Sequence, residues 1–375
     1  VLDEPTSALD PGAAEEVLAA LQRLVYDLGV TVLMSEHRLE RVIHTADRVV
    51  VIPGDGGPLR VGTPAQMMVD SPVAPPVVEL GRLASWSPLP LSIRDARRAA
   101  GPLRERLATM PAPSPAPRST ATTYAFTATE VVVRFGPVTA LNRLSLRASR
   151  GEVLALMGRN GAGKSTLLGA LVGLLRPAAG SVRLGTVDPA TLRGRDLVHH
   201  VGLVPQQPTD LLVADRVDSE CAASDTDAGA TAGTTREILD RLAPGIRDQT
   251  HPRDLSEGQR LALALSVVLA AAPPLVLLDE PTRGLDYPSK RLLGKALRQL
   301  ASQGHCIVLA THDVELAAEV ATRVAVIADG ELVADGPAAS IVVGSPMFAP
   351  QVAKVLSPLP WLTVTDVAAA LAGAS

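Results

Sequence analysis

The stretch "EVLALMGRNGAGKSTLLGALVGLL", residues 152–175, decides the fold class. Its apolar run at residues 153–157 is typical of a buried strand, and the apolar residues after Lys164 are typical of a helix. Between them lies "GRNGAGKST", residues 158–166, which has the pattern of a phosphate-binding loop in the required strand–loop–helix context. We therefore predict an α/β fold built around a phosphate-binding loop.

Each residue type in this loop has a physical reason to be there. Gly158, Gly161 and Gly163 let backbone N–H groups turn toward phosphate oxygens, and the start of the helix adds its positive dipole end. Lys164 can reach the β- and γ-phosphates of a nucleotide, and Ser165 is placed to ligate Mg²⁺. The chain has only four lysines, and one of them lies here. The predicted nucleotide-binding residues of the loop are Gly158, Arg159, Asn160, Gly161, Ala162, Gly163, Lys164, Ser165 and Thr166.

The sequence also contains an internal repeat. "VLDEPTSALD", residues 1–10, recurs as "LLDEPTRGLD", residues 277–286, with seven of the ten positions identical. After each copy the chain reads apolar strand, His, amphipathic helix, second apolar strand and glycine-containing hairpin. The likeness continues through "SPLPLSIRDA" (87–96) and "SPLPWLTVTDVA" (357–368). Two homologous units are therefore expected.

The two copies of the repeat differ in how much sequence precedes them. The second copy follows a long segment that starts near Tyr124 and holds the phosphate-binding loop, whereas only Val1 and Leu2 precede Asp3. We interpret residues 1–100 as the downstream remnant of a first unit with its extension. Residues 124–340 are predicted to be a complete second unit and residues 341–375 a C-terminal extension. Residues 101–123, rich in Pro, Ala, Ser and Thr, are predicted to be an extended linker.

Bulk properties narrow the function classes. A chain of 375 residues has room for two domains, and a net charge of −4 argues against nucleic acid as a partner. The two cysteines lack metal-ligand spacing, which favours a reducing compartment. The apolar stretch at residues 261–278 is nearly long enough to span a membrane, but Pro273 and Pro274 divide it. We expect a buried helix followed by a buried strand in a soluble, cytoplasmic protein.

A further motif narrows the class of nucleotide-binding protein. "DLSEGQ", residues 254–259, followed by "LLDEPTRGLD", resembles the ATP-binding cassette (ABC) family, whose signature is usually LSGGQ. Glu257 stands where the family commonly has Gly. The resemblance implies a P-loop NTPase cassette with a mixed or parallel sheet core and a helical subdomain, and a second, partial cassette at the N-terminus. The signature residues, which would contact ATP held by the opposite cassette, are Leu255, Ser256, Glu257, Gly258 and Gln259.

The resemblance also implies roles for single residues. Phe135 would stack on adenine, and Gln206 would contact Mg²⁺ and the attacking water, although the adjacent Gln207 is an alternative for that role. Glu280 would be the general base and His312 would contact the γ-phosphate. The Mg²⁺ ligands would be Ser165, Gln206 and Asp279; the remnant first cassette would supply Asp3, Glu4 and His37.

The two-cassette plan, with an extension after each cassette, resembles the ATPases of energy-coupling factor transporters. The resemblance implies ATP and Mg²⁺ as cofactors, hydrolysis coupled to import of a vitamin or transition-metal ion, and a peripheral position on the cytoplasmic face of the cell membrane. Its expected partners are a transmembrane coupling subunit, a substrate-binding membrane subunit and a second cassette, in cis or in a homodimer. Residues 218–239, usually more apolar in that family, are predicted here to be a low-complexity loop.

Two alternative functions stay open. A soluble tandem-cassette ATPase acting on ribosomes or DNA would carry a long charged linker, a coiled coil or paired-cysteine zinc sites, and the sequence shows none of these. A catalytically inactive regulatory cassette is disfavoured by the presence of both Glu280 and His312.

Overall fold

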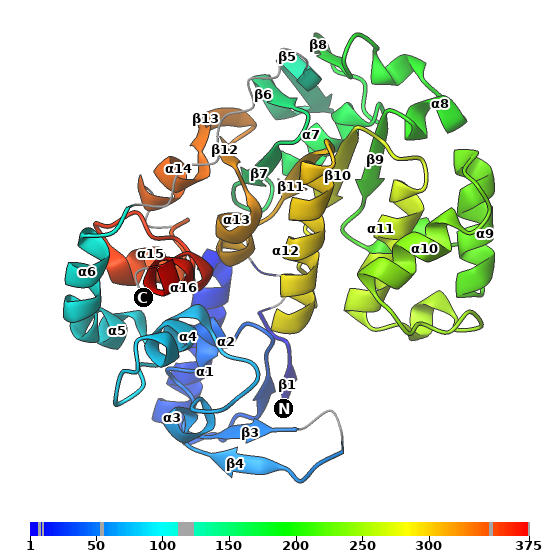
Figure 1. Ribbon diagram of the computed structural model, residues 1–375. Helices are drawn as coiled ribbons and strands as arrows, with labels where there is room; N and C mark the ends of the chain where they lie inside the picture. The colour runs from blue at the N-terminus through cyan, green and yellow to red at the C-terminus, as the bar shows by residue number, and fades with distance from the viewer. Residues whose placement is uncertain (7–8, 10, 53–55, 112–123, 345–347, 374–375) are drawn as a thin grey trace. The chain divides into compact units, whose positions relative to one another are not determined.

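The computed structural model describes residues 1–375 apart from 7–8, 10, 53–55, 112–123, 345–347 and 374–375. The chain divides into two compact units, drawn in Figure 1. The central unit comprises residues 116–285 and 289–341; the N-terminal unit comprises residues 1–115, 286–288 and 342–375. Each is described by itself below. Most of the predicted linker, residues 112–123, lies outside the described residues.

A six-stranded sheet forms the middle of the central unit. Its strands lie in the order β13-β12-β7-β11-β10-β9, and all neighbours are parallel except β12 and β13. Because the carboxyl ends of parallel strands meet at one edge, the segments that follow β7, β9, β10 and β11 lie there together. The strands are β7 (Val153–Met157), β9 (Val201–Val204), β10 (Leu275–Asp279), β11 (Cys306–Ala310), β12 (Arg323–Ala328) and β13 (Glu331–Pro337).

The alternation of side chains along these strands explains why the sheet is covered on both faces. In β10, Leu275 and Leu277 pack into one core, while Val276 and Leu278 pack into another on the opposite face. All five residues of β10 are buried, as expected for a parallel strand with helices on both sides. The sequence predicted a buried helix followed by a buried strand, and this prediction is confirmed: the helix is α11 (Glu257–Leu269) and the strand is β10. No helix in the described ranges is long and apolar enough to cross a membrane.

One face of the sheet is covered by α7 (Lys164–Leu171), which packs against a second, antiparallel sheet in the order β6-β5-β8. The other face is covered by α11, α12 (Tyr287–Ser302) and α13 (Val314–Val320), as Figure 1 shows. This confirms the predicted P-loop cassette fold with its mixed α/β core. The remaining elements of this part are β5 (Tyr124–Phe135), β6 (Val138–Ser149), β8 (Ala179–Arg183), η1 (Pro189–Thr191), α8 (Gly194–Val198) and α14 (Ala338–Gly344).

A helical part of the central unit includes residues for which the sequence predicted a low-complexity loop. That prediction is wrong: residues 217–242 form α9 (Val217–Ala228) and α10 (Thr234–Leu242), flanked by η2 (Pro208–Leu211) and η3 (Pro252–Asp254). Asp225, only 4% exposed, accepts hydrogen bonds from the N–H groups of Gly233 and Thr235 at 2.7 and 2.8 Å. The Thr235 hydroxyl also donates to Asp225, at 2.6 Å. The acidic side chain therefore organises the turn between the helices.

We expect the substitution Asp225→Ala to destabilise this helical part. It leaves the N–H groups of Gly233 and Thr235 without their acceptor, and the buried one, at Thr235, costs about 1–3 kcal/mol when unsatisfied. Urea denaturation should show a matching fall in the free energy of unfolding, and Asp227→Ala, at an exposed position on the same helix, should leave it unchanged. Equal stability of the Asp225→Ala variant and the parent protein would contradict this role.

The N-terminal unit combines residues from both ends of the chain in one core. Val77 and Leu80 of α4 pack in the same cluster as Val352 and Val355 of α15, and Gln351 Oε1 accepts a hydrogen bond from the Val77 N–H at 3.0 Å. The two extensions that follow the repeats therefore pack together. The elements are β1 (Leu2–Asp3), α1 (Pro11–Leu28), β2 (Met34–Ser35), α2 (Leu39–Val42), β3 (Val49–Val51), β4 (Arg60–Gly62), α3 (Pro64–Met67), α4 (Pro76–Leu83), α5 (Ile93–Ala99), α6 (Gly101–Ala108), α15 (Gln351–Leu356) and α16 (Val364–Gly373).

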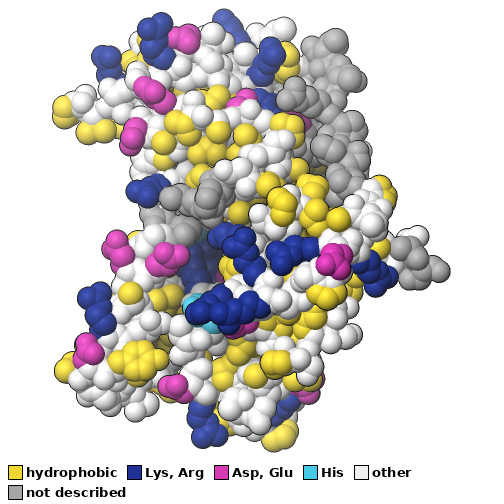
Figure 2. Space-filling model, turned by 90° about the vertical axis from the view of Figure 1, so that its left-hand side faces the viewer, with side chains coloured by type: hydrophobic (Ala, Val, Ile, Leu, Met, Phe, Trp, Pro, Cys, Tyr) yellow, Lys and Arg dark blue, Asp and Glu magenta, His cyan; other side chains and the backbone are white. Residues whose placement is uncertain are grey.

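The helix α6 lies inside the segment that the sequence predicted to be an extended linker. Leu103 and Leu107, four residues apart, lie on one face of this helix and are 7% and 1% exposed. Their burial in the core of the N-terminal unit gives residues 101–108 a helical structure despite the Pro-rich sequence that follows. On the face shown in Figure 2, charges of both signs are interspersed with hydrophobic and uncharged side chains, in keeping with the small net charge.

Candidate nucleotide-binding site

The loop between β7 and α7 has a shape that its glycines make possible. Gly158 has a φ of 151°, and a Cβ there would lie 2.3 Å from the Ile327 carbonyl oxygen. Gly163, the N-cap of α7, has a φ of 109°, and a Cβ there would lie 2.7 Å from the Ala140 oxygen. At both positions any side chain would clash with backbone, so the loop depends on glycine. The loop leads into the N-terminus of an eight-residue helix, as a phosphate-binding loop does.

Lys164 lies under this loop and is almost completely buried. Its side chain is 6% exposed, and Nζ donates to the carbonyl oxygens of Gly158 and Arg159 at 2.8 and 3.2 Å. The same ammonium lies 3.7 Å from Glu280 Oε1. A buried cation that bridges the loop and a carboxylate is well placed to attract phosphate oxygens, because its charge is poorly screened by solvent.

Asp279 and Ser165 form the part of the site that suits a metal ion. Asp279 ends β10, is 8% exposed and accepts a hydrogen bond from the Ser165 side chain. Burial raises the pKa of Asp279, which the Ser165 hydrogen bond partly offsets. In the described part of the chain, Asp279 Oδ1 is buried without a hydrogen-bond partner. A carboxylate with an unused buried oxygen beside a hydroxyl fits the oxygen ligands that Mg²⁺ prefers.

Glu280 and His312 form a close pair next to this carboxylate. Glu280 Oε2 lies 2.7 Å from His312 Nδ1 and accepts a hydrogen bond from the His312 backbone N–H at 3.3 Å. The two side chains are 10% and 9% exposed. Glu280 has a φ of 48°, and its own N–H donates to the Ala310 oxygen at 2.8 Å. This left-handed turn at the end of β10 directs the carboxylate toward the segment after β11.

The structure thus brings Lys164, Asp279, Glu280 and His312 into one buried cluster, with the exposed Ser165 beside Asp279. Gln206 follows β9, the neighbour of β10, and is exposed. Phe135 is 51% exposed at the end of β5, in the antiparallel sheet, so its ring is accessible from solvent. The loop residues Arg159, Asn160 and Gly161 are exposed, whereas Ala162 is 6% exposed.

The signature residues form the start of α11. The Ser256 side chain accepts from the Gln259 N–H at 3.3 Å, and Gln259 Oε1 accepts from the Ser256 N–H at 3.1 Å, which is a capping box. Glu257 pairs with Arg260 at 2.5 Å, and Leu255 is buried. In the described structure the side-chain hydrogen bonds and the ion pair of these residues lie within residues 256–260.

Sequence reasoning missed one member of this segment. Arg260 donates to the carbonyl oxygens of Pro252, Arg253 and Leu255 at 3.3, 3.0 and 2.8 Å, and so holds the backbone that leads into the signature. The i,i+3 spacing of Glu257 and Arg260 on a predicted helix was the available signal.

The first copy of the repeat reproduces the geometry of the second. β1 and β2 pair in parallel with Asp3 opposite Ser35, as Asp279 pairs with Ala310 in β10 and β11. His37 Nε2 lies 2.9 Å from Glu4 Oε1, and Glu4 has a φ of 43°. Here, however, the His and Glu side chains are 44% and 29% exposed. The two copies therefore share backbone register and the Glu–His pair, but only the second pair is buried.

The fold and this buried cluster define a nucleotide-binding cassette of the P-loop class. Comparisons with known proteins identify the family within this class. Residues 141–283 match the family described as ABC transporter. A putative ABC transporter ATP-binding protein of Streptomyces avermitilis is 62% identical over 400 residues, which cover 99% of this chain and 71% of that protein; one of Streptomyces coelicolor is equally similar over 399 residues. The chain belongs to the family of ABC transporter ATP-binding proteins.

Solved structures agree with this assignment. The structure of CbiO1 from Clostridium perfringens, described as part of the ABC transporter complex CbiONQ, is 25% identical and superposes with a TM-score of 0.53, covering 58% of this chain and 90% of that one. A nucleotide-free ATP-binding cassette from an ABC transporter is 20% identical with a TM-score of 0.54, which supports the fold alone. The chain is thus an ATP-binding subunit of an ABC transporter; the names of its relatives do not favour a ribosomal or DNA-directed role.

Proposed function

We propose that this chain hydrolyses ATP to drive an importer of the energy-coupling factor type. The observation that carries the proposal is the continuous buried cluster of Lys164, Glu280 and His312 at the carboxyl edge of the central sheet. A general base must lie within hydrogen-bond reach of a water and be held in a fixed direction. His312 fixes one carboxylate oxygen of Glu280, and the other oxygen faces Lys164, where phosphate would bind.

In the proposed reaction, the loop N–H groups and Lys164 hold the phosphates, and Glu280 accepts a proton from the water that attacks the γ-phosphate. His312 orients Glu280 and contacts the γ-phosphate, while Gln206, exposed beyond β9, contacts the attacking water. Ser165 and Asp279, with Gln206, would hold Mg²⁺, which neutralises developing charge on the phosphates when it is bound. Phe135 would stack on adenine. The signature residues 255–259 would serve ATP held by a second cassette.

The assignment to energy-coupling factor transporters rests on the two homologous units of the chain. The matched register of β1 and β2 and the Glu4–His37 pair support our interpretation of residues 1–100 as the remnant of a first cassette with its extension. Asp3, Glu4 and His37 would be its site residues. The similarity to a CbiO protein that belongs to a CbiONQ complex supports membrane partners of the same kind. We propose a transmembrane coupling subunit, a substrate-binding membrane subunit and a peripheral position on the cytoplasmic face of the membrane.

Mass spectrometry of the intact complex, purified through this polypeptide from detergent-solubilised host membranes, tests this proposal. We expect two hydrophobic membrane subunits together with the chain. ATP-dependent uptake of a vitamin or transition-metal ion by vesicles carrying that complex should accompany them. A complex that contains only ribosomal or other soluble proteins would overturn the importer assignment.

A further inference from the structure

A second buried ion pair lies one residue beyond His312. Lys290 Nζ, in the first turn of α12, lies 2.8 Å from Asp313 Oδ2. The two side chains are 12% and 5% exposed, so this pair is as buried as the Glu280–His312 pair. The proposed reaction gives neither residue a part. Burying two charges carries a desolvation cost that their attraction often fails to exceed, so the pair is weak evidence for a stability role.

The two oxygens of Asp313 have different partners. Oδ1 accepts a hydrogen bond from the Leu316 N–H at 3.1 Å and caps α13, whereas Oδ2 pairs with Lys290. The Asp313 N–H in turn donates to the Thr311 hydroxyl at 2.9 Å. Residues 311 and 313 are therefore held on both sides of His312, and the ion pair with Lys290 connects the Asp313 side chain to α12.

The first turn of α12 is itself held in place by its other neighbours. A Cβ at Gly258, in α11, would lie 2.8 Å from Ser289 Oγ, so the two helices touch beside Lys290. Glu257 also packs close to Gly284, which lies just before α12. A Cβ added at Gly284 would lie 3.1 Å from Glu257 Cγ. Lys290 thus extends from a turn in close contact with the signature segment to the cap of the helix that follows His312.

The first copy of the repeat has no counterpart of the Lys290–Asp313 ion pair. Ala14 occupies the position of Lys290 and Arg38 that of Asp313, as the alignment of residues 1–10 with 277–286 and of His37 with His312 shows. Arg38 makes no side-chain cap bond, and α2 has four residues where α13 has seven. The His beside Arg38 is the more exposed of the two, at 44% against 9%.

We infer that Lys290 and Asp313 are positioning residues that hold His312 against Glu280 for hydrolysis in the C-terminal cassette. The inference rests on the proposed ATPase mechanism. Asp313 caps α13 and Lys290 lies on α12, outside the phosphate-binding loop and the proposed Mg²⁺ ligands, so we expect the pair to act on turnover and to leave nucleotide affinity alone. An error of about 1 Å in the position of a reacting group can cost on the order of a hundredfold in rate.

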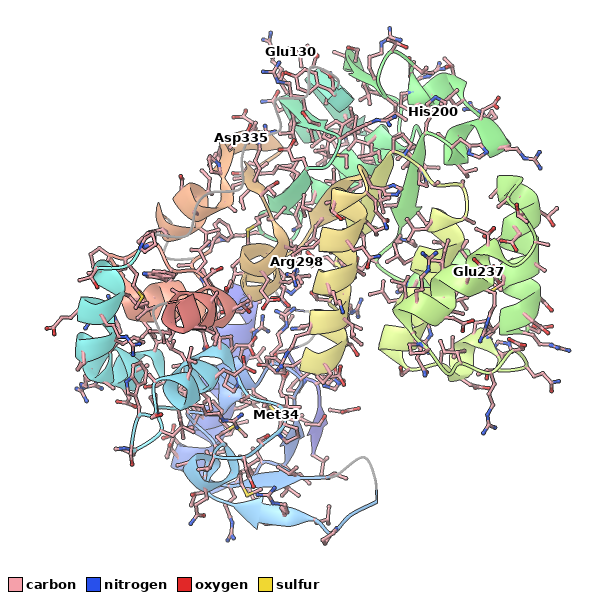
Figure 3. The ribbon with its side chains drawn as sticks, in the orientation of Figure 1. Met34, Glu130, His200, Glu237, Arg298 and Asp335 are labelled. Atoms are coloured by element: carbon pink, nitrogen blue, oxygen red, sulfur yellow. The ribbon has the colours of Figure 1, made fainter. Side chains whose placement is uncertain are left out.

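The test is a double-mutant cycle with Lys290→Met and Asp313→Asn in the native assembly. Asn keeps a side-chain oxygen for the α13 cap. We expect each single variant to lower kcat by about tenfold, with the dissociation constant of ATP within about twofold of the parent value. The double variant should be about as slow as either single variant, since both remove one shared interaction. Arg298→Met is the matched control, because Arg298, labelled in Figure 3, bonds α12 to the Glu319 oxygen at the far end of α13.

The double variant separates positioning from charge balance. If the pair only keeps a lone charge from being buried, removing both charges should restore the parent kcat, and that outcome would overturn the inference. Unchanged kcat in the single variants would overturn it as well. Loss of ATP binding in all three variants would do the same, since the pair would then maintain the fold. Failure of the proposed function is seen separately, as normal turnover by a Glu280→Gln variant.

Discussion

The substitution Glu280→Gln is expected to lower the rate of ATP hydrolysis by on the order of 10²–10⁴, the usual contribution of a positioned general base. Glutamine keeps the size of the side chain and an oxygen for the His312 N–H, which lies 3.3 Å from Glu280 Oε2. It cannot accept a proton from water. Binding of ATP should persist, because the loop and Lys164 are unchanged. Steady-state hydrolysis and equilibrium binding of a fluorescent ATP analogue measure the two effects separately.

Glu237→Gln is the matched control for this variant. Glu237 is exposed on α10, where Figure 3 labels it, and the same change of charge there should leave hydrolysis unaffected. Normal turnover by Glu280→Gln would show that the base is another residue. A variant that loses both turnover and nucleotide binding would instead point to a structural role for the Glu280–His312 pair.

The sequence predicted the parts of the site that depend on local patterns. Gly158, Gly163 and Lys164 follow one another in a loop whose chemistry is local, and the structure gives each glycine a left-handed φ. The apolar run at residues 275–278 predicted a buried strand, and Asp279 and Glu280 follow it directly. The sequence alone could not predict the direction of the Glu280 carboxylate. This direction depends on the φ of 48° at Glu280 and on His312, which lies 32 positions away in the chain.

One error in the sequence-based predictions arose where polar residues have tertiary partners. Residues 218–239 contain many acidic and small residues and were predicted to be a loop, yet Asp225 and Glu220 are buried acceptors of backbone N–H groups. Composition carries no information about such partners. For the same reason, the Lys290–Asp313 pair joins residues on two helices that no local motif connects.

The substitution Lys164→Ala is expected to weaken ATP binding itself, in contrast to Glu280→Gln. Hydrogen bonds to charged groups contribute about 1.5–3 kcal/mol, which corresponds to an increase of roughly 10- to 100-fold in the dissociation constant. Lys164 Nζ also lies 3.7 Å from Glu280 Oε1, so its loss removes a positive charge beside a buried carboxylate. Titration with ATP in the presence of Mg²⁺ measures the affinity.

A comparison of two variants separates the phosphate contact from this effect on Glu280. Lys164→Ala combined with Glu280→Gln removes the uncompensated carboxylate, so any loss of affinity that persists in the double variant belongs to the contact between Lys164 and phosphate. We expect most of the loss to persist, because the ammonium lies within the loop, 2.8 Å from the Gly158 oxygen. Lys295→Ala, at an exposed position on α12, should bind ATP like the parent protein. Recovery of full affinity in the double variant would mean that Lys164 serves to neutralise Glu280, and phosphate recognition would then depend on the backbone N–H groups of the loop.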